Sequence, residues 1–144
     1  MEWIKLEIDP VPWQRATPMV GGRSVAVIPK KTRDFERDIA ILFAAKWKRP
    51  RLEGPVEMMC CYAIRRPGKG KPGSRQAFPI IGFDIDNLEK ALMDGISKSK
   101  VVWKDDAQVV QVNKRKRWSD SKTGWIKVGI GPLRSGLIPD EFLG

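Results

Sequence analysis

The chain contains no histidine among its 144 residues. This absence excludes Ser-His-Asp and Cys-His catalytic sites and any metal bound by imidazole. The two cysteines, Cys60 and Cys61, are adjacent. Because neighbouring side chains of an extended segment point to opposite faces, the pair predicts neither a disulfide nor a zinc site. An enzyme of this composition must therefore use carboxylates, lysine or a metal held by oxygen ligands.

Long apolar runs are also missing. No stretch approaches the roughly 18 apolar residues that a membrane-spanning helix needs. The first ten residues, MEWIKLEIDP, alternate between apolar and polar side chains and contain no apolar core of a signal peptide. The sequence therefore predicts no membrane partner.

Acidic residues are the minority, with 17 Asp and Glu against 27 Lys and Arg, a formal net charge of +10 and a pI of about 9.9. Such a surface attracts polyanions. We expect nucleic acid rather than an anionic membrane, because the basic residues are spread over predicted loops and strands. The length and the hydrophobic fraction of 42% suit a single domain, residues 1–144, with a peripheral tail at 131–144.

Hydrophobic periodicity predicts an α/β (α+β) domain, in which a small mixed sheet packs one face against two main helices. Residues 2–8 alternate as a strand, whereas Phe35, Ile39 and Phe43 recur at helical spacing after a cap at Thr32. The other predicted elements are a buried strand at 56–64, a second helix and two strands at 107–118 and 124–130.

The second predicted helix opens at Asp86, which together with Glu89 resembles a capping box. An apolar stripe that includes Leu88 is expected to face the core. Asp86, Lys90 and Asp94 are four residues apart and share the opposite, polar side.

Two pairs of aspartates stand out in this basic chain, Asp84 with Asp86 and Asp105 with Asp106. Either pair alone has a local explanation, because Asp caps helices and favours turns. Gathered together, carboxylates repel unless a cation neutralises them. Mg²⁺ prefers carboxylate oxygens and can activate a water for attack on a phosphodiester. The combination therefore predicts a divalent metal that meets a polyanion.

Basic residues that could contact the phosphate backbone lie mainly in a long loop after residue 64 and in the later strand. The loop residues follow a phosphate backbone in one interpretation and form a solvated insertion in the other. The candidates for DNA binding are Arg15, Arg65, Arg66, Lys69, Lys71, Arg75, Lys114, Arg115, Lys116 and Arg117.

The segment from Asp84 to Val110 reads D-I-D-N-L-x-K-x-x-x-D and then V-V-W-K-D-D-A-Q-V-V. This joint pattern resembles the RusA family of Holliday junction resolvases. The resemblance implies a small homodimeric endonuclease that depends on Mg²⁺, for which Mn²⁺ can substitute. It also implies a cytoplasmic protein of a bacterium, prophage or phage.

The resemblance also implies a role for individual residues. Asp84, Asp86 and Asp106 match the catalytic acids that bind the metal. Lys90 matches a lysine that stabilises charge on the phosphate or orients the nucleophile. Asp94 matches an acidic position further along the helix.

The role of Asp105 follows from its place beside Asp106. Since the resemblance selects Asp106 as the third acid, Asp105 would be a turn residue that orients the loop. Gly82 and Phe83 depart from the family pattern, which often has Pro or basic residues there.

The function implied is cleavage of four-way DNA junctions by paired symmetric hydrolysis, in DNA recombination and repair. Two alternatives remain at this point. One is a metal-dependent nuclease for flaps or other branched DNA. The other is a non-catalytic basic DNA-binding protein whose acids are structural.

Overall fold

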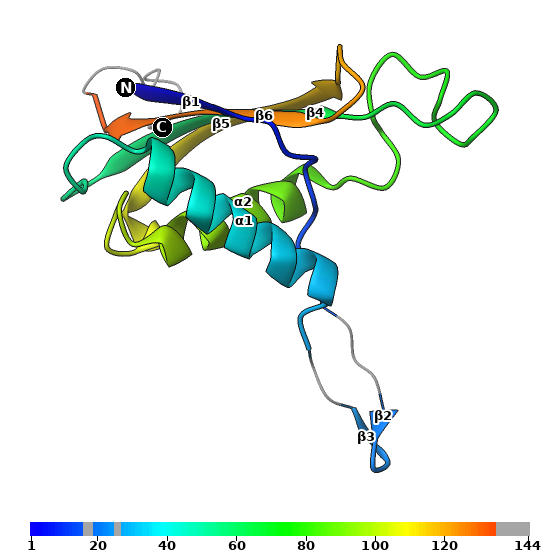
Figure 1. Ribbon diagram of the computed structural model, residues 1–144, viewed down its shortest axis with the longest axis horizontal. Helices are drawn as coiled ribbons and strands as arrows, with labels where there is room; N and C mark the ends of the chain where they lie inside the picture. The colour runs from blue at the N-terminus through cyan, green and yellow to red at the C-terminus, as the bar shows by residue number, and fades with distance from the viewer. Residues whose placement is uncertain (16–18, 25–26, 135–144) are drawn as a thin grey trace, which may run out of the picture.

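The computed structural model of the chain describes residues 1–15, 19–24 and 27–134. A four-stranded sheet forms one layer, and two helices cover the same face of it (Figure 1). This architecture confirms the predicted mixed sheet with two helices on one side. The elements in chain order are β1 (Glu2–Leu6), β2 (Met19–Val20), β3 (Arg23–Ser24), α1 (Lys30–Lys46), β4 (Val56–Ile64), α2 (Ile85–Ser99), the 3-10 helix η1 (Asp106–Gln108), β5 (Val109–Trp118) and β6 (Trp125–Pro132).

The strand β4 is central to the sheet, whose order is β1-β6-β4-β5. It runs parallel to β5 and antiparallel to β6, which in turn pairs with β1. Met58, Cys60 and Tyr62 of β4 point into the core, where each is at most 4% exposed. Burial raises the pKa of the Cys60 thiol to about 12, so it packs as a neutral side chain. Cys61 is partly exposed, which fits the predicted alternation.

The two helices approach each other closely at Gly95 of α2. A Cβ atom at this position would stand 2.6 Å from Cβ of Ile39 and 3.1 Å from the carbonyl oxygen of Glu36, so only glycine permits the contact. The buried Glu36 carboxylate also accepts a hydrogen bond from Lys98 of α2. These contacts fix α2 against α1, and with it the polar side of α2.

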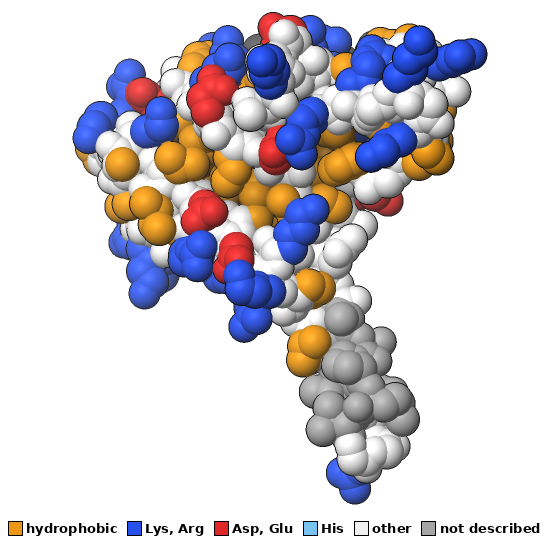
Figure 2. All heavy atoms as spheres, turned by 45° about the vertical axis from the view of Figure 1, so that its right-hand side comes forward, with side chains coloured by type: hydrophobic (Ala, Val, Ile, Leu, Met, Phe, Trp, Pro, Cys, Tyr) orange, Lys and Arg blue, Asp and Glu red, His pale blue; other side chains and the backbone are white. Residues whose placement is uncertain are grey.

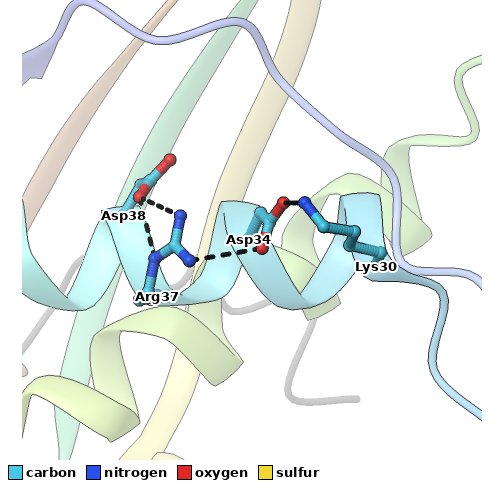
Figure 3. Close-up of polar contacts among 4 residues, drawn as sticks. All are labelled: Lys30, Asp34, Arg37 and Asp38. Carbon is cyan, nitrogen blue, oxygen red and sulfur yellow. Dashed lines mark hydrogen bonds and ion pairs between the residues drawn. The ribbon is translucent and has the colours of Figure 1, made fainter.

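The exposed side of α1 is covered by ion pairs (Figure 3). Lys30 Nζ lies 2.6 Å from Asp34 Oδ2, and Arg37 contacts both Asp34 and Asp38. The hydrogen bond from Lys30 lowers the pKa of the Asp34 carboxyl. Among the described helices, none is long and apolar enough to cross a membrane.

The predicted cap residue is wrong for both helices, by three residues for α1 and by two for α2. The residue before α1 is Pro29, with ψ of 150°, and Thr32 lies buried inside the first turn instead of capping it. Asp84 caps α2, because its side chain accepts a hydrogen bond from the backbone N–H of Asp86. The Glu89 side chain does not complete a capping box and contacts Lys114 of β5.

Candidate active site

A groove between α2 and the start of β5 collects four of the predicted site residues. Asp86, Lys90 and Asp94 line it from the polar side of α2, and Asp106 lines it from the first residue of η1. The groove has a volume of about 320 Å³, and its other lining includes apolar side chains of β5 such as Val109. This mixed lining places carboxylates beside apolar surface, where the ionised form is destabilised.

The 3-10 helix η1 determines which of the two adjacent aspartates reaches the groove. Asp105 caps η1, and its Oδ1 accepts a hydrogen bond of 2.8 Å from the backbone N–H of Ala107. Gln108 completes the capping box and donates to the carbonyl oxygens of Leu52 and Gly54. The segment is thereby tied to the loop before β4. Asp105 therefore caps η1, and Asp106 lines the groove.

Negative charge in the groove is incompletely neutralised. Partial burial raises the pKa of the Asp106 carboxyl, and a hydrogen bond with Asp105 and the charges of Asp105 and Asp94 raise it further. Lys90 opposes this shift but does not cancel it. Asp34 on α1 shows the opposite behaviour, because its pKa is lowered by the lysine one turn away. A groove in which the ionised form of a carboxyl group is destabilised is suited to bind a cation.

Lys114 of β5 faces the helices and bridges two acids of α2. Its Nζ lies 2.7 Å from Asp86 Oδ1 and also contacts the Glu89 carboxylate. Burial pulls the pKa of Lys114 down, but its hydrogen bonds to Asp86 and Glu89 and their charges outweigh this, and the pKa lies above its ordinary value. The predicted contact of Lys114 with DNA therefore competes with an internal ion pair. The sequence interpretation also missed Glu89 as part of this site.

Lys90 lines the groove and also contacts Trp13, which lines a neighbouring hollow. Its Nζ lies 3.6 Å from Asp94 Oδ2 and 4.8 Å from the centre of the Trp13 ring. Asp84 borders this hollow and not the groove, although its side chain is bonded to the backbone of Asp86 at 3.0 Å. The start of α2 thus separates the first two predicted acids into adjoining depressions.

The four consecutive basic residues of β5 point to two faces of the sheet. Lys114 and Lys116 pair across the sheet with Cys60 and Tyr62 of the core. Lys116 donates a hydrogen bond of 2.6 Å to the carbonyl oxygen of Phe83. Arg115 and Arg117 are exposed and alternate with these lysines, so they belong to the face that carries no helix. One DNA strand therefore cannot lie along all four residues at once.

One basic residue of the loop after β4 holds the loop in place, and the others have exposed side chains. Arg66 donates to the carbonyl oxygens of Ser74 and Gln76 and lies 4.9 Å from the centre of the Trp118 ring, so it holds the loop in place. Lys and Arg side chains, with fewer Asp and Glu among them, are spread over the face shown in Figure 2. The other predicted contacts are also exposed: Arg15, Arg65, Lys69, Lys71 and Arg75.

The donor atoms near the groove are suited to a hard cation. Carboxylate oxygens are the ligands that Mg²⁺ prefers, and the raised pKa of Asp106 indicates charge that a cation would neutralise. In residues 1–15, 19–24 and 27–134, no three Asp, Glu, Cys or His side chains lie close enough together to surround a metal ion. The donor chemistry fits, while the side chains in this structure are not gathered around one point.

A family model described as Endodeoxyribonuclease RusA matches residues 7–130. The chain belongs to the RusA family. The matched range contains the whole groove, from Asp86 to Val112, and it confirms the resemblance based on the aspartate pattern. A search of curated proteins finds no match. As a member of the RusA family, the chain is an endodeoxyribonuclease, a hydrolase of phosphodiester bonds in DNA.

Proposed function

We propose that this RusA-family protein is a Mg²⁺-dependent endonuclease that resolves four-way DNA junctions by paired, symmetric cuts. The observation that supports this proposal best is the groove shared by Asp86, Asp94 and Asp106, in a chain whose family cleaves DNA. The expected products carry 5′-phosphate and 3′-hydroxyl ends. The corresponding role is in DNA recombination and repair.

Asp86 and Asp106 would hold the Mg²⁺ ion from the groove, and Asp84 would join them from the adjoining hollow; Mn²⁺ would replace Mg²⁺. The bound ion would supply an activated water and stabilise negative charge on the phosphate. Asp86 is 79% exposed, so its contact with Lys114 is a weak surface ion pair that leaves this carboxylate available. Asp106 has the raised pKa, and its ionised form gains most from a neighbouring cation.

Lys90 would stabilise the charge that develops on the phosphate. Its ammonium is held at the groove by Asp94 and lies against the Trp13 ring. A cation fixed in this way needs little reorganisation when the reacting phosphate becomes more negative. Asp94 acts as a positioning residue, because it contacts Lys90.

The chain would bind DNA through the exposed basic loop, with Lys69, Lys71 and Arg75 against phosphates. A four-way junction offers two symmetric strands to cut. Two active sites related by a two-fold axis can cut both strands in a single encounter. We therefore propose that the protein acts as a homodimer. Light scattering that gives only the monomer mass of 16.3 kDa, at concentrations where junctions are cut, would refute this.

A panel of substrates tests the proposed function. Equal concentrations of a four-way junction, a flap and a linear duplex of the same length are incubated with the wild type and with Asp106→Asn, with and without Mg²⁺. We expect the wild type to cut the junction fastest, only with the metal, and with cuts at symmetric positions. Asp106→Asn should bind the junction and leave it intact, which excludes a contaminating nuclease.

Other outcomes of the panel separate the alternatives. Preferential cutting of the flap would replace junction resolution by another branched-DNA activity. Junction binding without metal-dependent cleavage would instead indicate a non-catalytic DNA-binding protein. Equal cutting of all three substrates would contradict structure selectivity.

A further inference from the structure

A hollow of about 350 Å³ adjoins the acidic groove at the start of α2. This volume is at the small end of the roughly 300–1,000 Å³ typical of ligand sites. Its lining combines the apolar side chains of Trp13, Ile80 and Phe83 with polar side chains from four residues: Gln14, Asp84, Asn87 and Lys116. A hollow with both apolar and polar walls is suited to a ligand that combines an apolar ring with polar groups.

The walls of the hollow are fixed to the elements that carry the active site. The backbone N–H of Trp13 donates a hydrogen bond of 2.8 Å to the carbonyl oxygen of Asn87 in α2. On another wall, Lys116 of β5 donates to the carbonyl oxygen of Phe83 at 2.6 Å. The loop that carries Trp13 and the segment before α2 are therefore both held in place. The hollow is formed before any ligand binds.

The surroundings of Trp13 indicate what the hollow would accept. Lys90 Nζ lies 4.8 Å and the Arg15 guanidinium 5.5 Å from the centre of its ring. The indole is only partly buried, and both cations lie over its ring, so a base stacked on it would take the place of one of them. A ligand with a planar ring and an attached anionic group would satisfy both features, and a nucleotide has this chemistry.

We propose that the hollow receives the nucleobase next to the cleaved phosphodiester, stacked on Trp13. This assignment rests on the proposed function. Lys90 contacts the Trp13 ring and also lines the groove, so one nucleotide can place its phosphate at the acids and its base against the indole. The Asn87 amide, with both donors and an acceptor, lines the hollow and would read the edge of the base.

This site would link base preference to the preference for branched DNA. A base in a continuous duplex must leave its stack to enter a pocket, and this cost is lowest for bases that are already unpaired or poorly stacked. Bases at a branch point meet that condition more easily than bases in a linear arm. The hollow would therefore favour junctions without any contact that recognises four arms.

A binding cycle between protein and DNA tests the proposal. Junction affinity is measured in EDTA, which prevents cutting, for the wild type and for Trp13→Ala. Each protein is tested with a junction that has its natural bases and with junctions that have an abasic site at one of the two nucleotides flanking the cut. Loss of one stacked base should weaken binding roughly 5- to 160-fold, from the range for base–aromatic stacking. At one of the two positions, Trp13→Ala and the abasic site together should cost no more than either alone.

Two further variants make the cycle decisive. Trp13→Phe keeps a smaller ring in the same packing, so it should lose part of the affinity for the junction that has its natural base and none for the abasic junction. This variant replaces Trp13→Ala if Trp13→Ala unfolds. Trp3→Ala removes an indole that is 49% exposed on the sheet face without helices, and it should bind both junctions as the wild type does.

If Trp13→Ala and the abasic site weaken binding independently at both positions, so that their effects multiply, the base pocket is overturned. The proposed function still stands in that case if the wild type cuts junctions. An unchanged affinity for the abasic junctions would overturn the base pocket in the same way. A wild type that cuts no junction would refute the proposed function, and the base pocket with it.

Discussion

Replacing Lys114 by methionine should destabilise the metal-free protein by about 1–2 kcal/mol. Methionine keeps most of the apolar stem, so the change removes mainly the ammonium. The Lys114 side chain is 25% exposed and that of Glu89 15% exposed, so this pair is partly shielded from water. A hydrogen bond to a charged group contributes roughly 1.5–3 kcal/mol, and we reduce that range for the remaining exposure. Asp86 is 79% exposed and should add little.

The assay is urea unfolding of a double-mutant cycle formed by Lys114→Met and Glu89→Gln, with Lys122→Met, in an exposed turn, as the control. The coupling between Lys114 and Glu89 should be about 1 kcal/mol. Because the pKa of folded Lys114 is raised, its stabilisation is fully present below the unfolded pKa and is lost only as pH rises through the folded value. The coupling should thus be constant from neutral to mildly alkaline pH. A coupling near zero would refute the reasoning and leave Lys114 free to contact DNA.

Three other predictions concern the groove and the basic loop. Lys90→Ala should slow junction cleavage by roughly 100-fold, the effect of removing one electrostatic stabiliser, and should change the free energy of unfolding by under about 1 kcal/mol; a near-normal rate would exclude the catalytic role. Asp106→Asn should make the metal-free protein more stable than wild type at neutral pH, because the raised pKa of Asp106 means that stability is lost as pH rises through it; urea unfolding should show the difference vanishing below the unfolded pKa of the carboxyl. Replacing Lys69, Lys71 and Arg75 by serine should flatten the plot of log affinity against log salt by about 0.9 for each phosphate that these side chains neutralise, and an unchanged slope would mean that the loop is merely solvated.

Regular elements could be predicted wherever burial imposes a pattern. The strand at Val56–Ile64 has the predicted bounds, because its apolar run is buried between two neighbouring strands and under the helices. Helix starts were less accurate. Thr32 and Asp86 both suit a cap by residue type, but Pro29 and Asp84 hold the cap positions. Residue preferences do not determine which of several suitable residues adopts the extended backbone before a helix.

The site was predictable where its residues share one helix and unpredictable where it depends on tertiary pairing. The spacing of Asp86, Lys90 and Asp94 indicated their common face directly. The pairing of Lys114 with Glu89 depends on β5 lying parallel to β4, which no local pattern indicates. Alternation in the strand could have shown that only every second basic residue points to the helices.

The hollow beside Asp84 is likewise a product of tertiary structure. Trp13 belongs to an irregular loop, and its hydrogen bond to Asn87 joins segments far apart in the sequence. A Pro-rich loop predicts neither this contact nor the nearness of Lys90.

Single-turnover cleavage of a four-way junction by Asp106→Asn and Asp105→Asn is the sharpest test of the proposed metal site. The proposed function requires Asp106 at the metal and leaves Asp105 to the cap of η1. Asp106→Asn should therefore bind the junction with undiminished affinity and show no cleavage with Mg²⁺. Asp105→Asn should still cut, more slowly by roughly 10- to 100-fold, as expected when a supporting group is removed. An active Asp106→Asn beside an inactive Asp105→Asn would contradict this assignment.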